Sequence, residues 1–217
     1  MASPLDGIRF IHAAIMVEAA HLDELAAAAR TEQQVMEFHE RLRFYENLLT
    51  IHTNGEEHHV FPLLEGKLPR SVQTYLFDHR EEEEIIRRLE RLATPRGGKG
   101  PSQPDLAEAA RDLRTHLSLH VRKENELIVP LLGELLSIPD QRTLAGALMG
   151  EVPKEMYPAL LPWLLQRLTE EERVGYLQMV RAGVPPQVFA SMAPLVRSSL
   201  PADELAPLIA AIPELRG

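Results

Sequence analysis

The 217-residue chain contains no cysteine. This absence excludes disulfide bonds, thiolate metal sites and cysteine nucleophiles, so any metal ion has to be held by imidazole nitrogen and carboxylate oxygen. Aromatic residues are scarce, at 5% of the chain, and runs of β-branched residues are nearly absent. Because Leu, Ala, Glu and Arg dominate instead, the composition favours an all-helical protein without a sheet.

The charge and the first residues narrow the range of partners. The formal net charge is -9 at pH 7, and the arginines are interleaved with glutamates, so a nucleic-acid partner is not expected. The first ten residues lack the basic and apolar regions of a secretory signal, and no apolar run approaches the length of a membrane span. We therefore expect a cytoplasmic protein with no membrane partner.

Helical periodicity predicts four long amphipathic helices in the first two thirds of the chain. They are expected at residues 7–30, 31–64, 71–92 and 105–136, with Thr31 and Asp105 as N-caps. Residues 93–104, ATPRGGKGPSQP, lack periodicity and predict a loop. Helices of similar length joined by short connections are typical of an up-down-up-down four-helix bundle. We assign this bundle to residues 1–138.

Residues 139–217 have a different sequence pattern, because recurring prolines divide them into short apolar helical segments. The sequence from Thr169 to Glu172 predicts a capping box that opens one of these helices. The segment is too apolar for a disordered linker, so we expect a C-terminal helical extension that buries its leucines. The bundle is the expected surface, and the alternative is a homodimer or a partner protein bound through these helices.

One spacing of histidine, glutamate and proline occurs twice in the predicted bundle. His120, Glu124 and Pro130 repeat the offsets of His52, Glu56 and Pro62. A separation of four residues puts two side chains about 6 Å apart along one face of a helix. This distance suits an imidazole and a bridging carboxylate on neighbouring metal ions, so the repeat predicts a site with two halves.

Residues equidistant from a turn lie at the same height in an antiparallel pair of helices. Counting from the predicted turns puts Glu56 opposite His79 and His12 level with His52. His116 lies at the edge of the same layer, as either an additional ligand or a partner of one. We expect all four helices to supply metal ligands, and the candidates are His12, His52, Glu56, His79, His116, His120 and Glu124.

The donor types indicate which metal the site prefers. Nitrogen and oxygen ligands without sulfur, with positions left for water or a small ligand, favour iron or manganese over a closed structural zinc site. One ion does not need so many donors. We therefore expect two iron ions bridged by Glu56 and Glu124, with manganese or zinc as the lesser alternatives.

Other charged and ligand-type residues have a plainer interpretation. The run from Glu81 to Glu84 is expected to face solvent and to stabilise its helix through ion pairs with nearby arginines. Glu57 and Glu83 are expected to be solvated or to contact a ligand. The remaining histidines are interpreted as ordinary core or surface residues, and they are His21, His39, His58 and His59.

Over about residues 5–136, the sequence resembles the hemerythrin-like (HHE cation-binding) domains. The resemblance rests on four motifs in order, namely His12, the segment 52–64, His79 and the segment 120–132. The resemblance implies a four-helix bundle with a non-haem di-iron centre, in which an oxo or hydroxo group bridges the ions. It also implies that this centre binds or processes dioxygen, peroxide or nitric oxide, or that the protein senses iron. Thr53 stands where several relatives have an acid and Glu83 where oxygen carriers have a histidine, which argues against simple oxygen carriage.

Two functions of different classes follow from this reading. The first is binding or processing of dioxygen, peroxide or nitric oxide at the di-iron site, with catalase-like breakdown of peroxide as the enzymatic form. The second is an iron or oxygen sensor, in which metal occupancy orders the bundle and the C-terminal helices report that state to a partner. A metal-free helical interaction module is the third alternative.

Overall fold

The computed structural model describes residues 3–94 and 103–216, which form helices joined by short turns, with no strand among them. The predicted all-helical class is confirmed. Most of the predicted loop at 93–104 lies outside the described residues. Contacts between residues divide the chain into two compact units, residues 15–126 and residues 1–14 with 127–217. None of the helices in the described ranges is long and apolar enough to cross a membrane.

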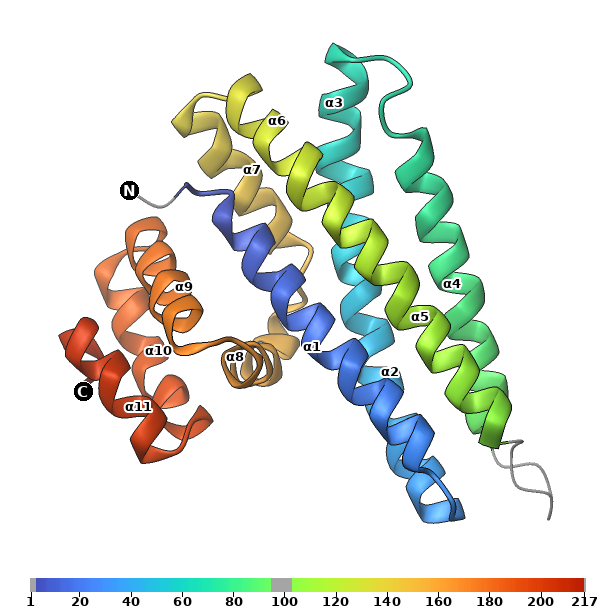
Figure 1. Cartoon of the computed structure of the whole chain (residues 1–217). Coiled ribbons are helices and arrows are strands. Elements are labelled where there is room, and N and C mark those ends of the chain that lie inside the picture. The colour runs from blue at the N-terminus through green and yellow to red at the C-terminus, as the bar shows by residue number, and fades with distance from the viewer. Residues whose placement is uncertain (1–2, 95–102, 217) are drawn as a thin grey trace. The chain divides into compact units, whose positions relative to one another are not determined.

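The unit of residues 15–126 contains the long helices of the predicted bundle. α1 (Asp6–Ala28) enters it at Ile15, and it continues with α2 (Glu32–Gly55), α4 (Gln73–Ala93) and α5 (Gln103–Lys123). α4 and α5 run side by side, and α4 also packs on α2 (Figure 1). These helices carry His52, His79 and His120, and the two glutamates of the sequence repeat follow directly after α2 and α5.

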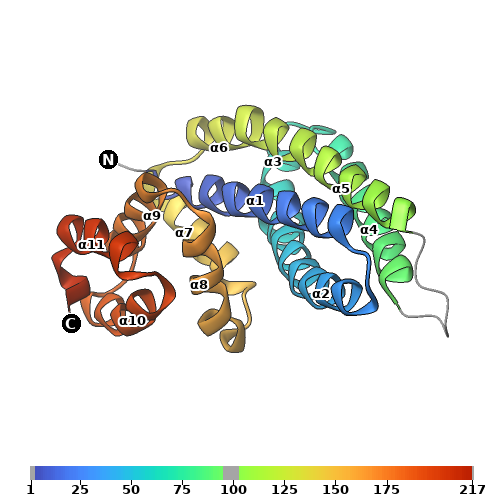
Figure 2. The same cartoon turned by 60° about the horizontal axis from the view of Figure 1, so that its bottom comes forward.

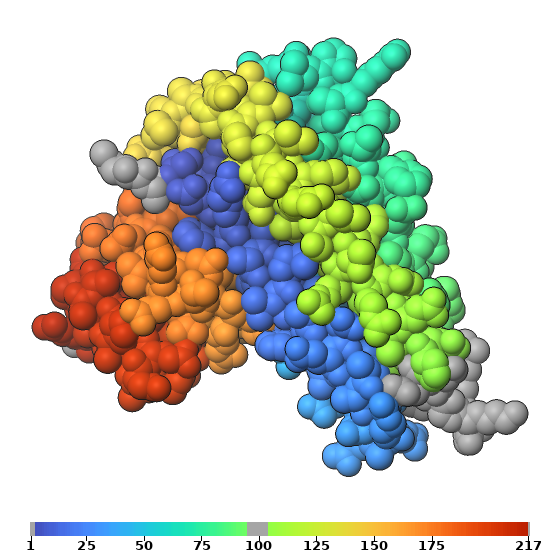
Figure 3. All heavy atoms as spheres, viewed as in Figure 1, coloured from blue at the N-terminus to red at the C-terminus, as the bar shows by residue number. Residues whose placement is uncertain are grey.

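Ion pairs tie α1 to both of its neighbours inside this unit. Glu18 is 1% exposed and forms an ion pair with Arg41 of α2. Asp23 accepts a hydrogen bond from Arg114 of α5 at 3.0 Å. The space-filling view shows atoms of α5 against those of α1 (Figure 3). Because a buried carboxylate is costly without a cation, the Glu18 pair also constrains how α1 and α2 align.

The N-terminal signals of the helices are confirmed in one case and wrong in another. The Thr31 hydroxyl accepts a hydrogen bond from the Gln34 backbone, and the Gln34 side chain accepts one from the Thr31 backbone, which is the capping box of α2. α5 is already helical at Gln103, so Asp105 lies in its first turn rather than at the predicted N-cap.

The second and fourth predicted helices are each interrupted by a π-helical turn. The turns are η1 (Glu56–Val60) and η2 (Glu124–Ile128), and they are followed by the short helices α3 (Phe61–Lys67) and α6 (Val129–Leu135). Each turn begins at the glutamate of the sequence repeat. The two predicted continuous helices are therefore wrong at the same place in both copies.

The prolines of the repeat explain these turns. Pro62 has no backbone N–H, and in a continuous α-helix its ring would clash with the carbonyl four residues earlier. In η1 the N–H of Phe61 reaches back five residues to the carbonyl of Glu56, which widens the helix at this point. Pro130 occupies the equivalent position after η2. The proline offset in the sequence is thus the signal for a widened turn at each glutamate.

The other unit is built mainly from short C-terminal helices. They are α7 (Ile138–Gly150), η3 (Lys154–Met156), α8 (Tyr157–Arg167), α9 (Glu170–Gly183), α10 (Pro186–Ser199), α11 (Ala202–Ala211) and η4 (Pro213–Arg216). α9, α10 and α11 gather together (Figure 2). Together with α8 they share an apolar core that includes Leu165, Leu177, Phe189, Val196 and Leu208. The capping box predicted at Thr169 is confirmed.

The first residues of the chain pack with this C-terminal unit. The Ser3 hydroxyl donates to the side-chain oxygen of Gln141 at 2.9 Å. The ring of Phe10 meets Tyr176 edge-on, with 6.0 Å between ring centroids. The start of α1 and the extension therefore belong to one unit, while the boundary proposed at residue 138 from sequence texture stays a prediction.

Candidate metal centre

Two buried histidines and two buried glutamates meet inside the unit of residues 15–126. Glu56 and Glu124 open the two π-helical turns, His79 lies on α4 and His120 lies on α5. Their exposed fractions are 6%, 1%, 3% and 2%, respectively. One ligand-type atom from each residue lies within 4.8 Å of the others. These donors form the first group of the candidate centre.

The distances in this group pair each imidazole with a carboxylate. Nε2 of His79 lies 3.3 Å from Oε2 of Glu56, and Nε2 of His120 lies 3.3 Å from Oε1 of Glu124. The two imidazole rings are 4.9 Å apart between centroids. The count from the predicted turns, which puts Glu56 opposite His79, agrees with this arrangement.

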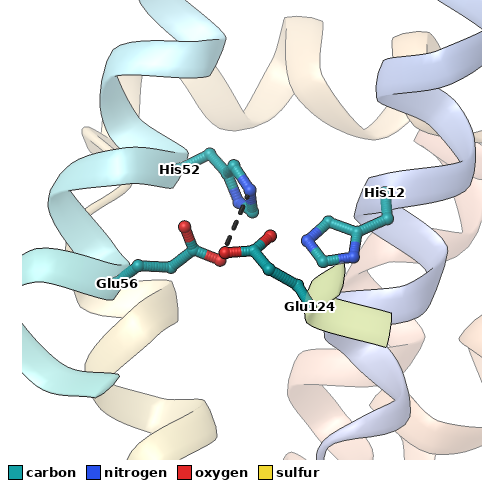
Figure 4. A group of neighbouring side chains, drawn as sticks. All are labelled: His12, His52, Glu56 and Glu124. Carbon is teal, nitrogen blue, oxygen red and sulfur yellow. Dashed lines mark ion pairs between the residues drawn. The ribbon is translucent and has the colours of Figure 1, made fainter. Parts of the chain in front are cut away.

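A second group of donors shares both glutamates with the first. Ligand-type atoms of His52, Glu56 and Glu124 lie within 4.8 Å of one another. Nε2 of His52 lies 3.5 Å from Oε1 of Glu56. Figure 4 shows these side chains turned toward one another. Each of the two carboxylates can therefore contribute to two neighbouring metal positions.

His12 lies on α1, which is one uninterrupted helix across the boundary between the two units. Its side chain is 1% exposed. From Ile15 onward α1 belongs to the unit that holds the two donor groups, and His12 precedes Ile15 by less than one helical turn.

Neighbouring carboxylates determine which ring nitrogen of two histidines faces the centre. Nδ1 of His120 lies 3.1 Å from Oδ2 of Asp78, and Nδ1 of His79 lies 2.8 Å from Oε1 of Glu57. Since a carboxylate only accepts, each Nδ1 donates, which leaves Nε2 for a metal. The Nε2 atoms of His79 and His120 are buried without a hydrogen-bond partner.

The electrostatics of the protein alone favour positive charge at this position. Burial lowers the pKa of His120, but the carboxylates of Glu124, Glu82 and Glu56 together outweigh burial and raise the pKa to about 10. Burial also opposes the charged form of His79, whose pKa is raised by Glu56 and Glu57. Protons on these imidazoles and a metal ion would compete for the same lone pairs, so metal binding would displace protons.

His116 lies outside both donor groups. Its Nε2 is 3.1 Å from the backbone carbonyl of Asp78, and because a carbonyl only accepts, Nε2 is the donor. Its Nδ1 is 3.7 Å from a carboxylate oxygen of Glu81, whose side chain is half exposed. In this structure His116 holds the backbone next to His79 rather than joining the cluster of Nε2 atoms.

Glu82 is a buried carboxylate that the sequence interpretation missed. It is 3% exposed, and its Oε1 lies 3.6 Å from Nε2 of His116 and 4.0 Å from Nε2 of His120. Burial raises the pKa of Glu82 to about 7, although the charge of His120 acts in the opposite direction. The prediction that this acidic run faces solvent is therefore wrong at Glu82.

The rest of the acidic run is solvated, as predicted. The side chain of Glu83 is 63% exposed and pairs with Arg87 at 2.6 Å, and that of Glu84 is 68% exposed and pairs with the same arginine. The available signal for Glu82 was its position three residues after His79, which puts both side chains on one face of α4.

Comparison with known proteins places these features in a family. A family model described as the hemerythrin HHE cation binding domain matches residues 3–132. The zinc finger protein BRUTUS of Arabidopsis thaliana is 27% identical over 173 residues, which cover 78% of this chain and 14% of that protein. Two BRUTUS-like zinc finger proteins of the same plant are 23% and 24% identical over 201 and 212 residues.

These relatives are much longer than the chain. Each of the two BRUTUS-like matches covers 86% of this chain, but only 16% and 17% of the respective relative. The chain thus spans less than a fifth of the length of the curated relatives it matches. No solved structure matches it significantly.

Proposed function

This chain belongs to the hemerythrin HHE cation-binding family, and on that premise we propose that it holds two iron ions inside an up-down-up-down bundle of α1, α2, α4 and α5. The observation that carries this proposal is that Glu56 and Glu124 each belong to both donor groups. Carboxylates shared in this way are suited to bridge two ions, as in other helical bundles with carboxylate-rich metal sites.

The remaining ligands divide between the two positions. His79 and His120 would hold one ion through Nε2, because their Nδ1 atoms already donate to Glu57 and Asp78. His52 and His12 would hold the other. For His12 the support is its burial and its place on α1, the helix that continues into the unit that contains His52.

The donor chemistry fits iron. The donors are imidazole nitrogens and carboxylate oxygens, which suit iron and manganese, and the chain has no thiolate to favour a structural zinc site. The buried Nε2 atoms of His79 and His120, which have no hydrogen-bond partner, support a cation at this place.

We infer that the small ligand of the centre is dioxygen, peroxide or nitric oxide. A bound pair of iron ions supplies redox chemistry and open coordination positions for such ligands. Aromatic rings contact two of the donors. The ring of Phe61 stacks on that of His79 with 5.4 Å between centroids, and the ring of Tyr75 meets that of His120 edge-on with 6.1 Å between centroids. These rings pack against the imidazoles and place apolar surface beside the donors, which suits small ligands.

Metal analysis tests the core of the proposal. Protein purified from iron-rich medium should contain two iron ions per chain and show charge-transfer absorption. The double variant His120→Ala, Glu124→Ala should lose most of the iron and this absorption. His21→Ala is the matched control, because His21 is an exposed histidine on α1. Wild-type protein with well under one metal ion per chain would refute the site.

Oxygen evolution separates peroxide breakdown from simple binding. If the iron-loaded protein processes peroxide, added peroxide should yield dioxygen at a rate that the double variant lacks. If the centre only binds its ligand, peroxide or nitric oxide should change the optical spectrum without turnover. Iron-loaded protein that shows neither response would contradict this part of the proposal.

A metal sensor is the second candidate, and the path of the chain favours it. Two donor-bearing elements continue from one compact unit into the other. α1 crosses the boundary just after His12, and η2 crosses it two residues after Glu124 begins the turn. Metal that orders these elements could therefore stabilise residues 127–217. Hydrogen exchange should then slow in α9 and α11 on iron loading, and unchanged exchange there would exclude this mechanism.

A further inference from the structure

Three helical segments of the bundle each present a histidine and a glutamate about one turn apart. His52 with Glu56 and His120 with Glu124 are the pairs of the sequence repeat. The structure adds His79 with Glu82 on α4, because both side chains are buried, at 3% exposure each. Residues three apart lie on one helix face. α4 therefore offers the same two donor types as the two segments of the repeat.

The surroundings of Glu82 leave one of its oxygens unsatisfied. Oε1 is buried and has no hydrogen-bond partner. The nearest imidazole nitrogen, Nε2 of His116, is 3.6 Å away, which is too far for a hydrogen bond, and it already donates to the carbonyl of Asp78. A buried carboxylate oxygen in this condition is costly unless a cation compensates it.

The unsatisfied oxygen lies beside the donor cluster. It is 4.0 Å from Nε2 of His120, the nitrogen that is oriented toward the centre. Two donors that each bind one ion at about 2 Å are separated by no more than about 4 Å. The position of Oε1 is therefore within reach of an ion held by His120.

We propose that Glu82 is a third carboxylate ligand of the centre, on the ion held by His120. This inference rests on the proposed function, since it concerns the same ion. It gives that ion a harder and more negative donor set than the second position, which has no equivalent residue from α4. The added negative charge favours the ferric over the ferrous state, so the two ions differ in reduction potential.

Substitutions at Glu82 and its exposed neighbour test the ligand role. Glu82→Gln removes the charge but keeps the shape, and Glu82→Asp keeps the charge but withdraws the oxygen by one methylene group. Glu83→Gln is the control, because that side chain is exposed on the same helix. Ferrous iron is titrated anaerobically against a chromophoric chelator, the reduction potential and the electron paramagnetic resonance spectrum are recorded, and circular dichroism verifies the fold.

The wild-type protein and Glu83→Gln should bind two ions with the same affinities. Loss of an outer-shell partner of a ligand commonly weakens metal binding 10–100-fold, so loss of a direct ligand should weaken one of the two ions by at least about tenfold. Both Glu82 variants should show this loss and an altered resonance spectrum. Glu82→Gln should also have a more positive reduction potential.

The possible outcomes separate the two proposals. Wild-type binding of two ions, with wild-type affinities and spectra in both Glu82 variants, would overturn the ligand role and leave the di-iron site standing. If Glu82→Asp keeps the wild-type affinities and spectra while Glu82→Gln changes them, only the charge at residue 82 matters. That result would also overturn the ligand role of Glu82. Failure of the wild-type protein to bind iron would refute the proposed function itself.

Discussion

Oδ2 of Asp78 lies 3.1 Å from Nδ1 of His120 and also pairs with Lys123. The carboxylate thus links α4 to α5 directly beside the donor cluster. Because Nδ1 donates to it, the ring of His120 is held with Nε2 toward Glu124. Burial opposes ionisation of Asp78, but its bonds to Lys123 and His120 prevail and lower its pKa. The carboxylate is therefore charged and able to orient the imidazole at neutral pH.

Asp78→Ala should weaken metal binding without removing a ligand. The substitution leaves His120 free to rotate and to change its tautomer, so we expect a 10–100-fold loss of affinity. Competition with a chromophoric chelator measures this loss. Asp112→Ala is the control, since Asp112 also links α5 to α4, through Arg88, but is about half exposed. Equal affinities of Asp78→Ala and wild type would show that the contact does not orient the ligand.

The stability of the metal-free protein should depend on pH through His120. Its pKa is about 10 in the folded protein, against an ordinary value of 6.5, because the neighbouring carboxylates outweigh burial. A raised pKa means that the folded protein binds this proton more tightly than the unfolded chain. The stabilisation is fully present below pH 6.5 and is lost as the pH rises through about 10. Denaturant midpoints across this range should fall, and they should fall less in His120→Gln.

Metal uptake near neutral pH should release protons for the same reason. The pKa of His120 is raised to about 10, so this imidazole has to give up its Nε2 proton to bind a metal ion, and the pKa of His79 is shifted in the same direction. Iron added to metal-free protein in weak buffer should acidify a pH indicator, and His120→Gln should release fewer protons. His58→Gln is the control, because His58 is exposed. Binding without any proton release would contradict the protonated state of the metal-free site.

The proximity of the paired histidines and glutamates could be predicted because it depends on helical periodicity and on counting from turns. Both are local properties of the sequence, as is the capping box at Thr31. The count from the turns alone puts Glu56 opposite His79, where the two side chains lie 3.3 Å apart. The spacing of His120 and Glu124 similarly indicated two side chains that do lie together in the structure.

The parts that were missed depend on packing between helices. Glu82 sits in a run of four glutamates that look alike in sequence, but its side chain is buried and lies 4.0 Å from Nε2 of His120 on α5. Asp78 is a single acid whose role depends on the position of His120 across the helix pair. The π-helical turns were missed because a proline within a helix predicts an interruption but not its hydrogen-bond pattern.

Pro62→Ala should disturb the centre while leaving the helix content nearly unchanged. The substitution restores an N–H and removes the ring clash, so the α-helical bond from residue 62 to the carbonyl of His58 becomes available. Conversion of η1 to regular helix would turn Glu56 relative to Phe61, which stacks on His79. We expect weaker metal binding and nearly unchanged circular dichroism.

Pro130→Ala should have the same effect at η2, and the double substitution should weaken binding more than either one. Pro139→Ala is the control, because Pro139 lies in the first turn of α7, where proline is well tolerated. If both Pro62→Ala and Pro130→Ala bind iron like the wild type, the widened turns are not needed to place the glutamates.

Leu177→Ala should destabilise the C-terminal unit and leave metal binding intact. Leu177 is fully buried in the apolar core shared by α8 to α11. Removal of a buried leucine side chain costs about 2–5 kcal/mol, because it loses apolar burial and leaves a cavity. Since both donor groups lie outside this core, the variant should still bind two iron ions per chain while α9 and α10 exchange their amide hydrogens faster. Loss of iron together with faster exchange would instead show that the two units fold as one, as the sensor mechanism requires.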